Sequence, residues 1–181
     1  VAVDTPVAQI LPELKDVGVY NGGGGGVPFI TKAPAEPMRM LDLLRHTAGL
    51  TYGFQQRTNV DAAYRQLDLE NFFGAYDLDG LIAALGRLPL DFSPGEAWNY
   101  SVSTDVVGYL VQKLCGKPLG EVLQERIFGP LKMTDTGFSV RPGQEARLAA
   151  CYEATPGAGL RLQDDPRTSP FLNPPKLESG G

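Results

Sequence analysis

The sequence predicts a mainly α-helical fold with a small β-hairpin and long loops. Several segments place apolar residues three and four positions apart, which is the spacing of a helix with one buried face. Glycine and proline, 22 and 15 of the 181 residues, occur between these segments, where they end helices or form turns. Only one pair of short segments, toward the carboxyl end, has the pattern of a strand–turn–strand unit.

The first segment predicts a short helix followed by a loop. The helix covers residues 6–14, and Pro12 interrupts or ends it. Its apolar residues are Val7, Ile10, Leu11 and Leu14. The glycines at positions 22–26 lose more backbone entropy on ordering than other residues would. We therefore expect residues 21–36 to form a Gly-rich, mobile loop rather than a strand or a helix.

Three helices are predicted between residues 37 and 88. Pro37 opens the first, which ends at Gly49, a left-handed cap with Leu50 as its hydrophobic partner. Residues 61–69 are compatible with the second, and residues 78–88 form the third. The expected apolar face of the first consists of Met38, Leu41, Leu43 and Leu44. That of the third consists of Leu81, Ile82, Leu85 and Leu88.

Two more helices follow the turn at residues 94–100. Ser103 is a good N-cap for the first, Asp105 complements the helix dipole in its first turn, and Gly116 ends it. Pro118 begins the second. The expected buried stripe of the first is Val107, Leu110, Val111 and Leu114. The second carries Leu119, Val122, Leu123 and Ile127.

The carboxyl-terminal part predicts a hairpin and an irregular tail. Residues 147–153 and 159–163 predict two strands joined through a turn at 156–159. From residue 164 to residue 181 the chain is Pro-rich, so no regular structure is expected there. The sequence shows no internal repeat and no linker between two cores, and the simplest organisation is one domain over residues 1–181.

Composition excludes several classes of function. Sixteen Lys and Arg against 21 Asp and Glu give a net charge of −5, without the basic stripe that binds nucleic acid. No run of about 18 apolar residues predicts a membrane span, and the first residues lack the pattern of a signal peptide. Cys115 and Cys151 lack the spacing of a metal site, so we expect reduced cysteines, no metal and no cofactor. The compartment stays open, with the cytoplasm favoured.

The usual sequence signatures of a hydrolase are absent. A hydrolase needs a nucleophile, a base and a pocket that stabilises charge. The chain contains no Gly-x-Ser-x-Gly, no Ser-x-x-Lys and no Lys-Thr-Gly. Its single histidine, His46, excludes the His-Glu-x-x-His zinc motif. By spacing alone, the sequence does not predict a self-sufficient enzyme.

Four segments follow one another in a recognisable order. They are DTPVAQILPEL at residues 4–14, LLRHTAGL at 43–50, PGEAWNYSVSTDVVG at 94–108 and IFGPLKMTDTGF at 127–138. In this order they resemble the DPVxxYLPE, LLxHTSGL, PGxxWxYSxxxxxxLG and IFxPLGMxxTxF segments of the serine β-lactamase-like family. That family includes class C β-lactamases, D-alanyl-D-alanine peptidases and β-lactamase-fold esterases. The resemblance implies the helical lobe of the β-lactamase/transpeptidase-like fold.

The resemblance also implies a longer hydrolase with two lobes. In such enzymes the Ser-x-x-Lys motif precedes the segment that residues 4–14 resemble, and the Lys-Thr-Gly-like motif follows on an α/β lobe. We therefore expect residues 1–181 to be an excised helical lobe whose partner is the α/β lobe of the parent chain. The isolated chain is expected to be inactive, because the nucleophile lies outside it.

Tyr100 is the catalytic residue that the resemblance implies. The family tyrosine assists proton transfer from the nucleophilic serine during acylation and to the leaving group afterwards. A free phenol titrates at about pH 10, so acting as a base requires a neighbouring cation, such as the lysine of Ser-x-x-Lys. Because this chain lacks that lysine, Tyr100 is expected to be an ordinary phenol here.

The candidate substrate-binding residues are Ser101, Val102, Tyr52 and Phe54. Val102 stands where the β-lactamase pattern has the Asn of Tyr-x-Asn, and an isopropyl group cannot make the hydrogen bonds of an amide. We therefore favour a carboxylesterase parent that acts on a small-molecule ester through an acyl-enzyme. Tyr52 and Phe54 belong to an aromatic-rich stretch that could form an acyl-binding wall.

Simpler roles are expected for other residues of these motifs. Trp98 is expected in the core, and Ser101 and Ser103 as caps or turn formers rather than nucleophiles. His46 is expected to interact with the carbonyls at the end of its helix. Two further functions stay open: a β-lactamase or D-alanyl-D-alanine peptidase parent that acts on a lactam or a peptide, and a non-catalytic binding or structural module.

Overall fold

The computed structural model describes residues 1–157 and 159–178, which form two compact units. Unit 1 comprises Val1–Leu119 together with the described residues from Lys176 onward, and unit 2 comprises Gly120–Pro175. Helices and short helical turns dominate the secondary structure, and two antiparallel hairpins complete it. The predicted fold class, mainly α with a β-hairpin and long loops, is confirmed, and a second hairpin adds to it.

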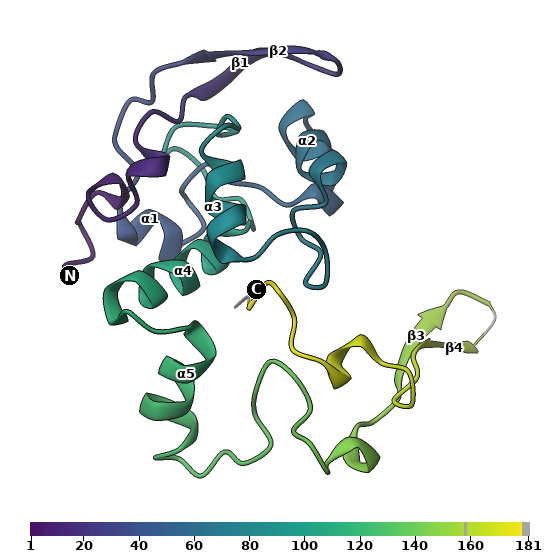
Figure 1. Ribbon diagram of the computed structural model, residues 1–181. Helices are drawn as coiled ribbons and strands as arrows, with labels where there is room; N and C mark the ends of the chain where they lie inside the picture. The colour runs from purple at the N-terminus through teal and green to yellow at the C-terminus, as the bar shows by residue number, and fades with distance from the viewer. Residues whose placement is uncertain (158, 179–181) are drawn as a thin grey trace. The chain divides into compact units, whose positions relative to one another are not determined.

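In unit 1, two helices pack against a third, longer one. Its helices are α1 (Met40–Leu44), α2 (Asn59–Leu67), α3 (Leu78–Leu85) and α4 (Ser103–Cys115). Both α1 and α3 pack against α4, as Figure 1 shows. The amino-terminal segment forms two 3-10 turns, Val7–Gln9 and Pro12–Leu14, on either side of the interruption predicted at Pro12.

Two helices form where the sequence predicts them, and both have capped starts. The Thr58 hydroxyl accepts from the Asp61 amide at 3.1 Å, and the Asp61 carboxylate accepts from the Thr58 amide at 2.8 Å, which closes a capping box on α2. Asp77 caps α3 by accepting from the Gly80 amide at 2.8 Å. The residues predicted to face inward from the third helix are all buried: Leu81, Ile82, Leu85 and Leu88.

Helix α4 buries a different stripe from the predicted one. Its buried apolar side chains are Val106, Tyr109 and Leu110. Leu114, which was expected inside, is 48% exposed, so the buried residues lie in the amino-terminal part of the helix. Val106 is as apolar as Val107, and periodicity alone therefore cannot place the stripe to within one residue. Gly116 ends the helix in the left-handed conformation, with φ 64°, as predicted.

Helix α1 is shorter than predicted. It begins at Met40 rather than at Pro37, and the Asp42 carboxylate closes its first turn by accepting from the Arg39 amide at 3.0 Å. Leu44 was expected on the buried face but is 55% exposed. A five-residue helix has little more than one turn, so it cannot bury the whole apolar set that a longer helix would.

The left-handed residue after α1 is not the predicted glycine. His46 adopts φ 55° there, which is uncommon for a residue with a side chain. Gly49 also has a positive φ, 83°, but for a different reason. A Cβ atom at Gly49 would lie 2.2 Å from the Phe92 carbonyl oxygen, so this glycine permits two backbones to approach closely.

The Gly-rich segment is a hairpin, and the loop predicted over residues 21–36 is wrong. Strand β1 (Val19–Gly24) pairs with β2 (Val27–Lys32) in antiparallel register with two irregularities. The glycines make these irregularities possible: a Cβ at Gly23 would lie 2.1 Å from the Pro28 carbonyl oxygen. The entropic cost of ordering glycine is therefore offset by pairing that only glycine permits.

Tertiary contacts hold this hairpin against the rest of unit 1. The Tyr20 amide donates to the Leu90 carbonyl at 2.7 Å, and the Asn59 side chain donates to the Gly23 carbonyl at 2.8 Å. Strand β1 contacts helix α2, and Val19 is 3% exposed. Sequence pattern around a glycine run does not reveal such partners, because they come from residues tens of positions away.

Unit 2 contains helical turns and the second hairpin. The elements are α5 (Leu119–Leu123), which starts at the last residue of unit 1, a π-helical turn (Gln124–Phe128), 3-10 turns at Glu145–Arg147 and Pro170–Leu172, and strands β3 (Cys151–Thr155) and β4 (Gly159–Asp164). The hairpin of β3 and β4 confirms the predicted strand pair, which begins four residues later than expected. Ala158, in the predicted turn, and residues 179–181 of the predicted tail lie outside the described residues.

Candidate active site

Tyr100 lies on a segment that runs alongside the chain after α1. Residues 95–102 donate backbone hydrogen bonds to residues 46–51, so the segments at 43–50 and 94–108 are spatial neighbours although about 50 residues of sequence separate them. The Gly95 amide donates to the Thr47 carbonyl (2.8 Å), the Asn99 amide to the His46 carbonyl (2.9 Å), and the Val102 amide to the Thr51 carbonyl (3.2 Å). The sequence motifs therefore converge on one place in unit 1.

The aromatic side chains of this segment point outward. Tyr100 is 43% exposed, and Trp98, which was expected in the core, is 68% exposed. Asn99 between them points inward instead: it is 7% exposed, and its amide donates to the Leu50 carbonyl at 3.0 Å. The side chains on either side of the inward-pointing Asn99 therefore face the surface. The Tyr100 phenol is thus accessible from outside unit 1.

His46 contacts Tyr100 and its neighbours, and this role is missed by the sequence analysis. Its Nδ1 atom lies 3.3 Å from the Ser101 amide nitrogen, which donates to it, and 3.3 Å from Ser101 Oγ. Its ring centroid is 5.0 Å from that of Tyr100 and 6.3 Å from that of Trp98. Burial lowers the pKa of His46 below its usual value. The expected interaction with helix-terminal carbonyls is replaced by these contacts because His46 turns away from α1 at its positive φ.

A cavity of about 240 Å³ opens beside Tyr100. Its walls come from α3, α4, the segments around residues 52–54 and 69–72, and the chain near the carboxyl end, where the Leu177 amide donates to the Phe72 carbonyl at 3.1 Å. The lining residues are Tyr52, Phe54, Leu69, Glu70, Phe72, Leu81, Tyr100, Val102, Asp105 and Leu177. Most of this surface is apolar or aromatic, which suits an apolar group of a ligand.

The structure brings four of the five candidate residues to this cavity. Tyr100, Val102, Tyr52 and Phe54 all line it. Ser101 does not: it is fully buried, and its hydroxyl lies 2.8 Å from the Ser103 hydroxyl and beside His46. Ser101 therefore points into the protein, whereas its neighbours Tyr100 and Val102 line the cavity.

Tyr52 is held by a buried carboxylate. Its hydroxyl donates to Asp105 Oδ2 at 3.2 Å, and Asp105 is 3% exposed at the start of α4. The Tyr52 ring stacks on Phe54 with centroids 5.1 Å apart, and it is tilted against Tyr100 at the same separation. Burial and the Asp105 charge raise the pKa of Tyr52, which keeps its phenol protonated as a donor. The three aromatic rings therefore form one wall.

Glu70 supports the same wall from the other side. Its carboxylate accepts from the Gly53 amide at the start of the 3-10 turn Gly53–Gln55, which carries Phe54. Burial raises the pKa of Glu70 above its usual value, against the effect of these amide donors. Nothing in the sequence indicates that Glu70 and Asp105 line the same cavity, because they lie on separate segments of the chain.

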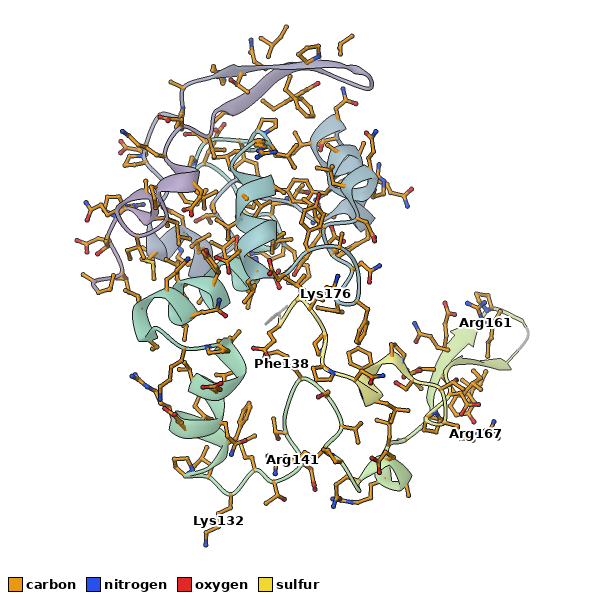
Figure 2. The ribbon with its side chains drawn as sticks, viewed as in Figure 1. Lys132, Phe138, Arg141, Arg161, Arg167 and Lys176 are labelled. Atoms are coloured by element: carbon orange, nitrogen blue, oxygen red, sulfur yellow. The ribbon has the colours of Figure 1, made fainter. Side chains whose placement is uncertain are left out.

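A second cavity, of about 310 Å³, lies within unit 2. It is bordered by Phe138 and Arg141, which Figure 2 labels on the long connection after the π-helical turn, and by the Arg147–Asp135 ion pair at 2.6 Å. None of the five candidate residues lines it. The cavity beside Tyr100 is therefore the candidate active site, although it is the smaller of the two.

Residues 1–157 and 159–178 contain neither a candidate metal centre nor a candidate membrane-spanning helix. These residues include no group of three or more His, Cys, Asp or Glu side chains placed to hold a metal ion. No helix among them combines the length and the apolar character needed to cross a membrane.

Comparison with known proteins places this arrangement in a family. The Beta-lactamase family model matches residues 1–171. Protein Rv1367c of Mycobacterium tuberculosis is 35% identical over 181 residues, and Esterase EstB of Burkholderia gladioli is 31% identical over 166 residues. Among solved structures, EstCE1, described as a hydrolase with promiscuous acyltransferase activity, matches with a TM-score of 0.72 at 26% identity. The chain belongs to the Beta-lactamase family.

The chain corresponds to only part of each of these relatives. The alignments cover 99%, 90% and 91% of this chain but 43% of Rv1367c, 38% of EstB and 39% of EstCE1. The chain thus spans about two fifths of the length of the relatives it matches. The mostly helical architecture, with its two small hairpins, is part of the β-lactamase/transpeptidase fold.

Proposed function

We propose that this chain is the helical lobe of a serine hydrolase that cleaves carboxylic esters through an acyl-enzyme, with the nucleophile supplied from outside these 181 residues. One observation carries the proposal: an accessible phenol, Tyr100, stands at the edge of a largely apolar cavity of about 240 Å³. The esterase among the relatives and the hydrolase with acyltransferase activity among the solved structures support it.

In this proposal Tyr100 moves protons during acyl transfer. It accepts the proton of the attacking serine hydroxyl and delivers it to the leaving alkoxide, so that no net proton is consumed in acylation. Tyr100 accepts a proton at neutral pH only as its phenolate, which a neighbouring cation must stabilise. The described lining of the cavity includes the carboxyl groups of Glu70 and Asp105 but no Lys, Arg or His side chain. The required ammonium would therefore come with the nucleophile, from the α/β lobe of the parent chain.

Two features of the cavity favour an ester over a lactam or a peptide. Val102 lines it where an amide side chain would be needed to hydrogen-bond a substrate amide. In addition, the carboxyl groups of Asp105 and Glu70 in its wall oppose the entry of an anionic acyl group. The proposed substrate is therefore a small ester with a neutral, apolar acyl group, and Tyr52, Phe54 and Val102 would contact that group.

The test uses the full-length protein that contains this chain. We expect hydrolysis of p-nitrophenyl butyrate to exceed that of a chromogenic cephalosporin in kcat/KM. The Tyr100→Phe variant should lower kcat for the ester by about 10²- to 10⁴-fold, the range for a lost general acid–base catalyst. Tyr152→Phe, at a tyrosine that is 56% exposed in unit 2, is the matched control and should leave kcat unchanged.

Other outcomes would replace the proposal. A preference for the cephalosporin would indicate a β-lactamase or peptidase parent. Absence of turnover of either substrate by the folded full-length protein would favour a binding or structural module. Ester hydrolysis that Tyr100→Phe leaves unchanged would remove Tyr100 from the mechanism.

A further inference from the structure

We propose that His46 is a positioning residue that sets the orientation of Tyr100 by holding the backbone on both of its sides. The contacts themselves do not depend on the proposed function, but their consequence for catalysis rests on it. The proposal concerns one side chain that the motif comparison leaves without a role and that lies outside the cavity lining.

His46 accepts two hydrogen bonds from the neighbours of Tyr100, one with its backbone and one with its side chain. Its backbone carbonyl accepts from the Asn99 amide at 2.9 Å, immediately before Tyr100. Its imidazole Nδ1 accepts from the Ser101 amide at 3.3 Å, immediately after Tyr100. A single residue therefore binds the backbone amides of both neighbours of the tyrosine, while the Tyr100 carbonyl accepts from the Gln55 side chain. These bonds restrain the backbone that carries the Tyr100 side chain.

The imidazole ring also contacts the phenol ring directly. The two centroids are 5.0 Å apart at an interplanar angle of 50°, which is within the range of favourable aromatic pairs. Both the ring contact and the backbone bonds require the left-handed conformation of His46, with φ 55°. A residue with a Cβ atom rarely adopts this conformation, and the surrounding hydrogen bonds must offset its cost.

The acceptor role requires an unprotonated Nδ1. An N–H at Nδ1 would face the Ser101 N–H, so the bond exists only in the neutral tautomer with its proton on Nε2. The groups that face the ring are the aromatic rings of Tyr100 and Trp98 and the Ser101 hydroxyl, which lies 2.8 Å from the Ser103 hydroxyl. Arg45 precedes His46 in the chain, and Arg57 donates to the Asn99 side chain at 2.5 Å.

Acidification should therefore release the residue after Tyr100. Burial lowers the pKa of His46 below its usual value of about 6.5, so the ring is neutral at pH 7 and above. As the pH falls through the lowered pKa, Nδ1 gains a proton and the bond from Ser101 is lost. A pH-dependent change at Ser101 is thus a signature that a purely space-filling histidine would not produce.

Nuclear magnetic resonance on the 181-residue chain tests the tautomer directly. His46 is the single histidine, so its two ring nitrogens can be assigned without ambiguity in a long-range ¹H–¹⁵N spectrum. At pH 7.5 we expect a proton on Nε2 and none on Nδ1, and the Ser101 amide shift should follow the His46 titration. A proton on Nδ1, or a Ser101 amide that ignores the titration, would overturn the proposal.

Two variants separate the side chain from the backbone conformation. Asn and Gly both tolerate a positive φ, but only Asn places an acceptor, Oδ1, near the position of Nδ1. We expect hydrogen exchange of the Ser101 amide to stay near the wild-type rate in His46→Asn and to rise at least about tenfold in His46→Gly. Equal exchange rates in the two variants would contradict the role of Nδ1.

Kinetics of the full-length protein test the consequence for catalysis. His46→Gly should lower kcat for p-nitrophenyl butyrate by roughly 10- to 100-fold with KM within about twofold, because a misplaced catalytic group slows the chemical step. His46→Asn should recover most of this loss and should remove any fall in kcat that follows the His46 titration. Equal kcat values in the two variants would overturn the positioning role, whereas the failure of the proposed function would appear as absent turnover with the resonance results intact.

Discussion

At the scale of single residues, the hydroxyl of Tyr52 is the clearest polar contact at the cavity. It donates to Asp105, whose carboxylate is 3% exposed, in a surrounding of apolar and aromatic side chains. A buried carboxylate that loses a donor bears the full cost of its desolvation, which is larger than the net gain from an average hydrogen bond. The pair therefore contributes to stability as well as to the shape of the cavity wall.

Removal of that hydroxyl should destabilise the protein measurably. We expect Tyr52→Phe to lower the free energy of unfolding by about 1–3 kcal/mol, because Asp105 stays buried with one donor fewer. Urea denaturation of the 181-residue chain measures the change. Tyr152→Phe, at an exposed tyrosine, should change it by less than about 0.5 kcal/mol. Equal effects of the two substitutions would show that the Tyr52–Asp105 bond adds no stability.

At the scale of elements, the 3-10 turn Gly53–Gln55 depends on Glu70, whose pKa is raised by burial. A carboxyl with a raised pKa binds more protons in the folded state than in the unfolded state, so stability falls as the pH rises from about 4.5 through the folded-state pKa. Gln at this position keeps an acceptor for the Gly53 amide but does not titrate. The two side chains thus differ mainly in their response to pH.

We accordingly expect Glu70→Gln to become more stable relative to the wild type as the pH rises. The measurement is the difference in unfolding free energy between the two proteins at pH 4.5 and at pH 8. A difference that stays constant over this range, or one that shifts toward the wild type, would show that burial does not raise the pKa of Glu70. Glu70→Ala, which removes the acceptor, should be less stable than either at both values.

The β1–β2 hairpin makes a separate prediction about close backbone approach. Gly23 and Gly25 both have positive φ, at 83° and 64°, but a Cβ would lie 2.1 Å from the Pro28 carbonyl oxygen at Gly23 and more than 4 Å from any atom at Gly25. We expect Gly25→Ala to cost about 1 kcal/mol for its conformation alone and Gly23→Ala to cost clearly more. Thermal unfolding compares them, and equal melting temperatures would mean that the approach of the strands is not required for stability.

The same elements show what the sequence can and cannot predict. Helices α2 and α3 carry strong caps and a clear apolar face, and both form where they are predicted. Strand β1 could not be predicted, because its partners include Leu90 and Asn59, far along the chain. Periodicity also fails to choose between Val106 and Val107 in α4, where only packing against α1 and α3 decides.

The sequence likewise predicts some residues of the candidate site and misses others. Motif resemblance selects Tyr100, and the aromatic stretch selects Tyr52 and Phe54, all of which line the cavity. Ser101 is the exception, because contacts of its hydroxyl with Ser103 and His46 hold it inside the protein. His46, Glu70 and Asp105 act through contacts made across the fold, and no local pattern in the sequence distinguishes them from ordinary surface or capping residues.

At the scale of the whole molecule, we propose that the chain supplies a phenol and a cavity while the attacking hydroxyl comes from elsewhere in the parent protein. Ser101 and Ser103, the serines nearest to Tyr100 in sequence, are buried and hydrogen-bonded to each other, and Ser101 also contacts His46, so neither is placed as a nucleophile. The chain covers 38–43% of the relatives EstB and Rv1367c, which leaves ample length for the other lobe.

Covalent labelling shows whether the attacking serine lies outside the 181 residues. A fluorophosphonate reacts with an activated serine hydroxyl, and mass spectrometry of the digested protein identifies the labelled residue. We predict one labelled serine in the full-length protein, outside the 181 residues, and no label on the 181-residue chain under the same conditions. A label on any serine within this chain, Ser101 or Ser103 above all, would contradict the account.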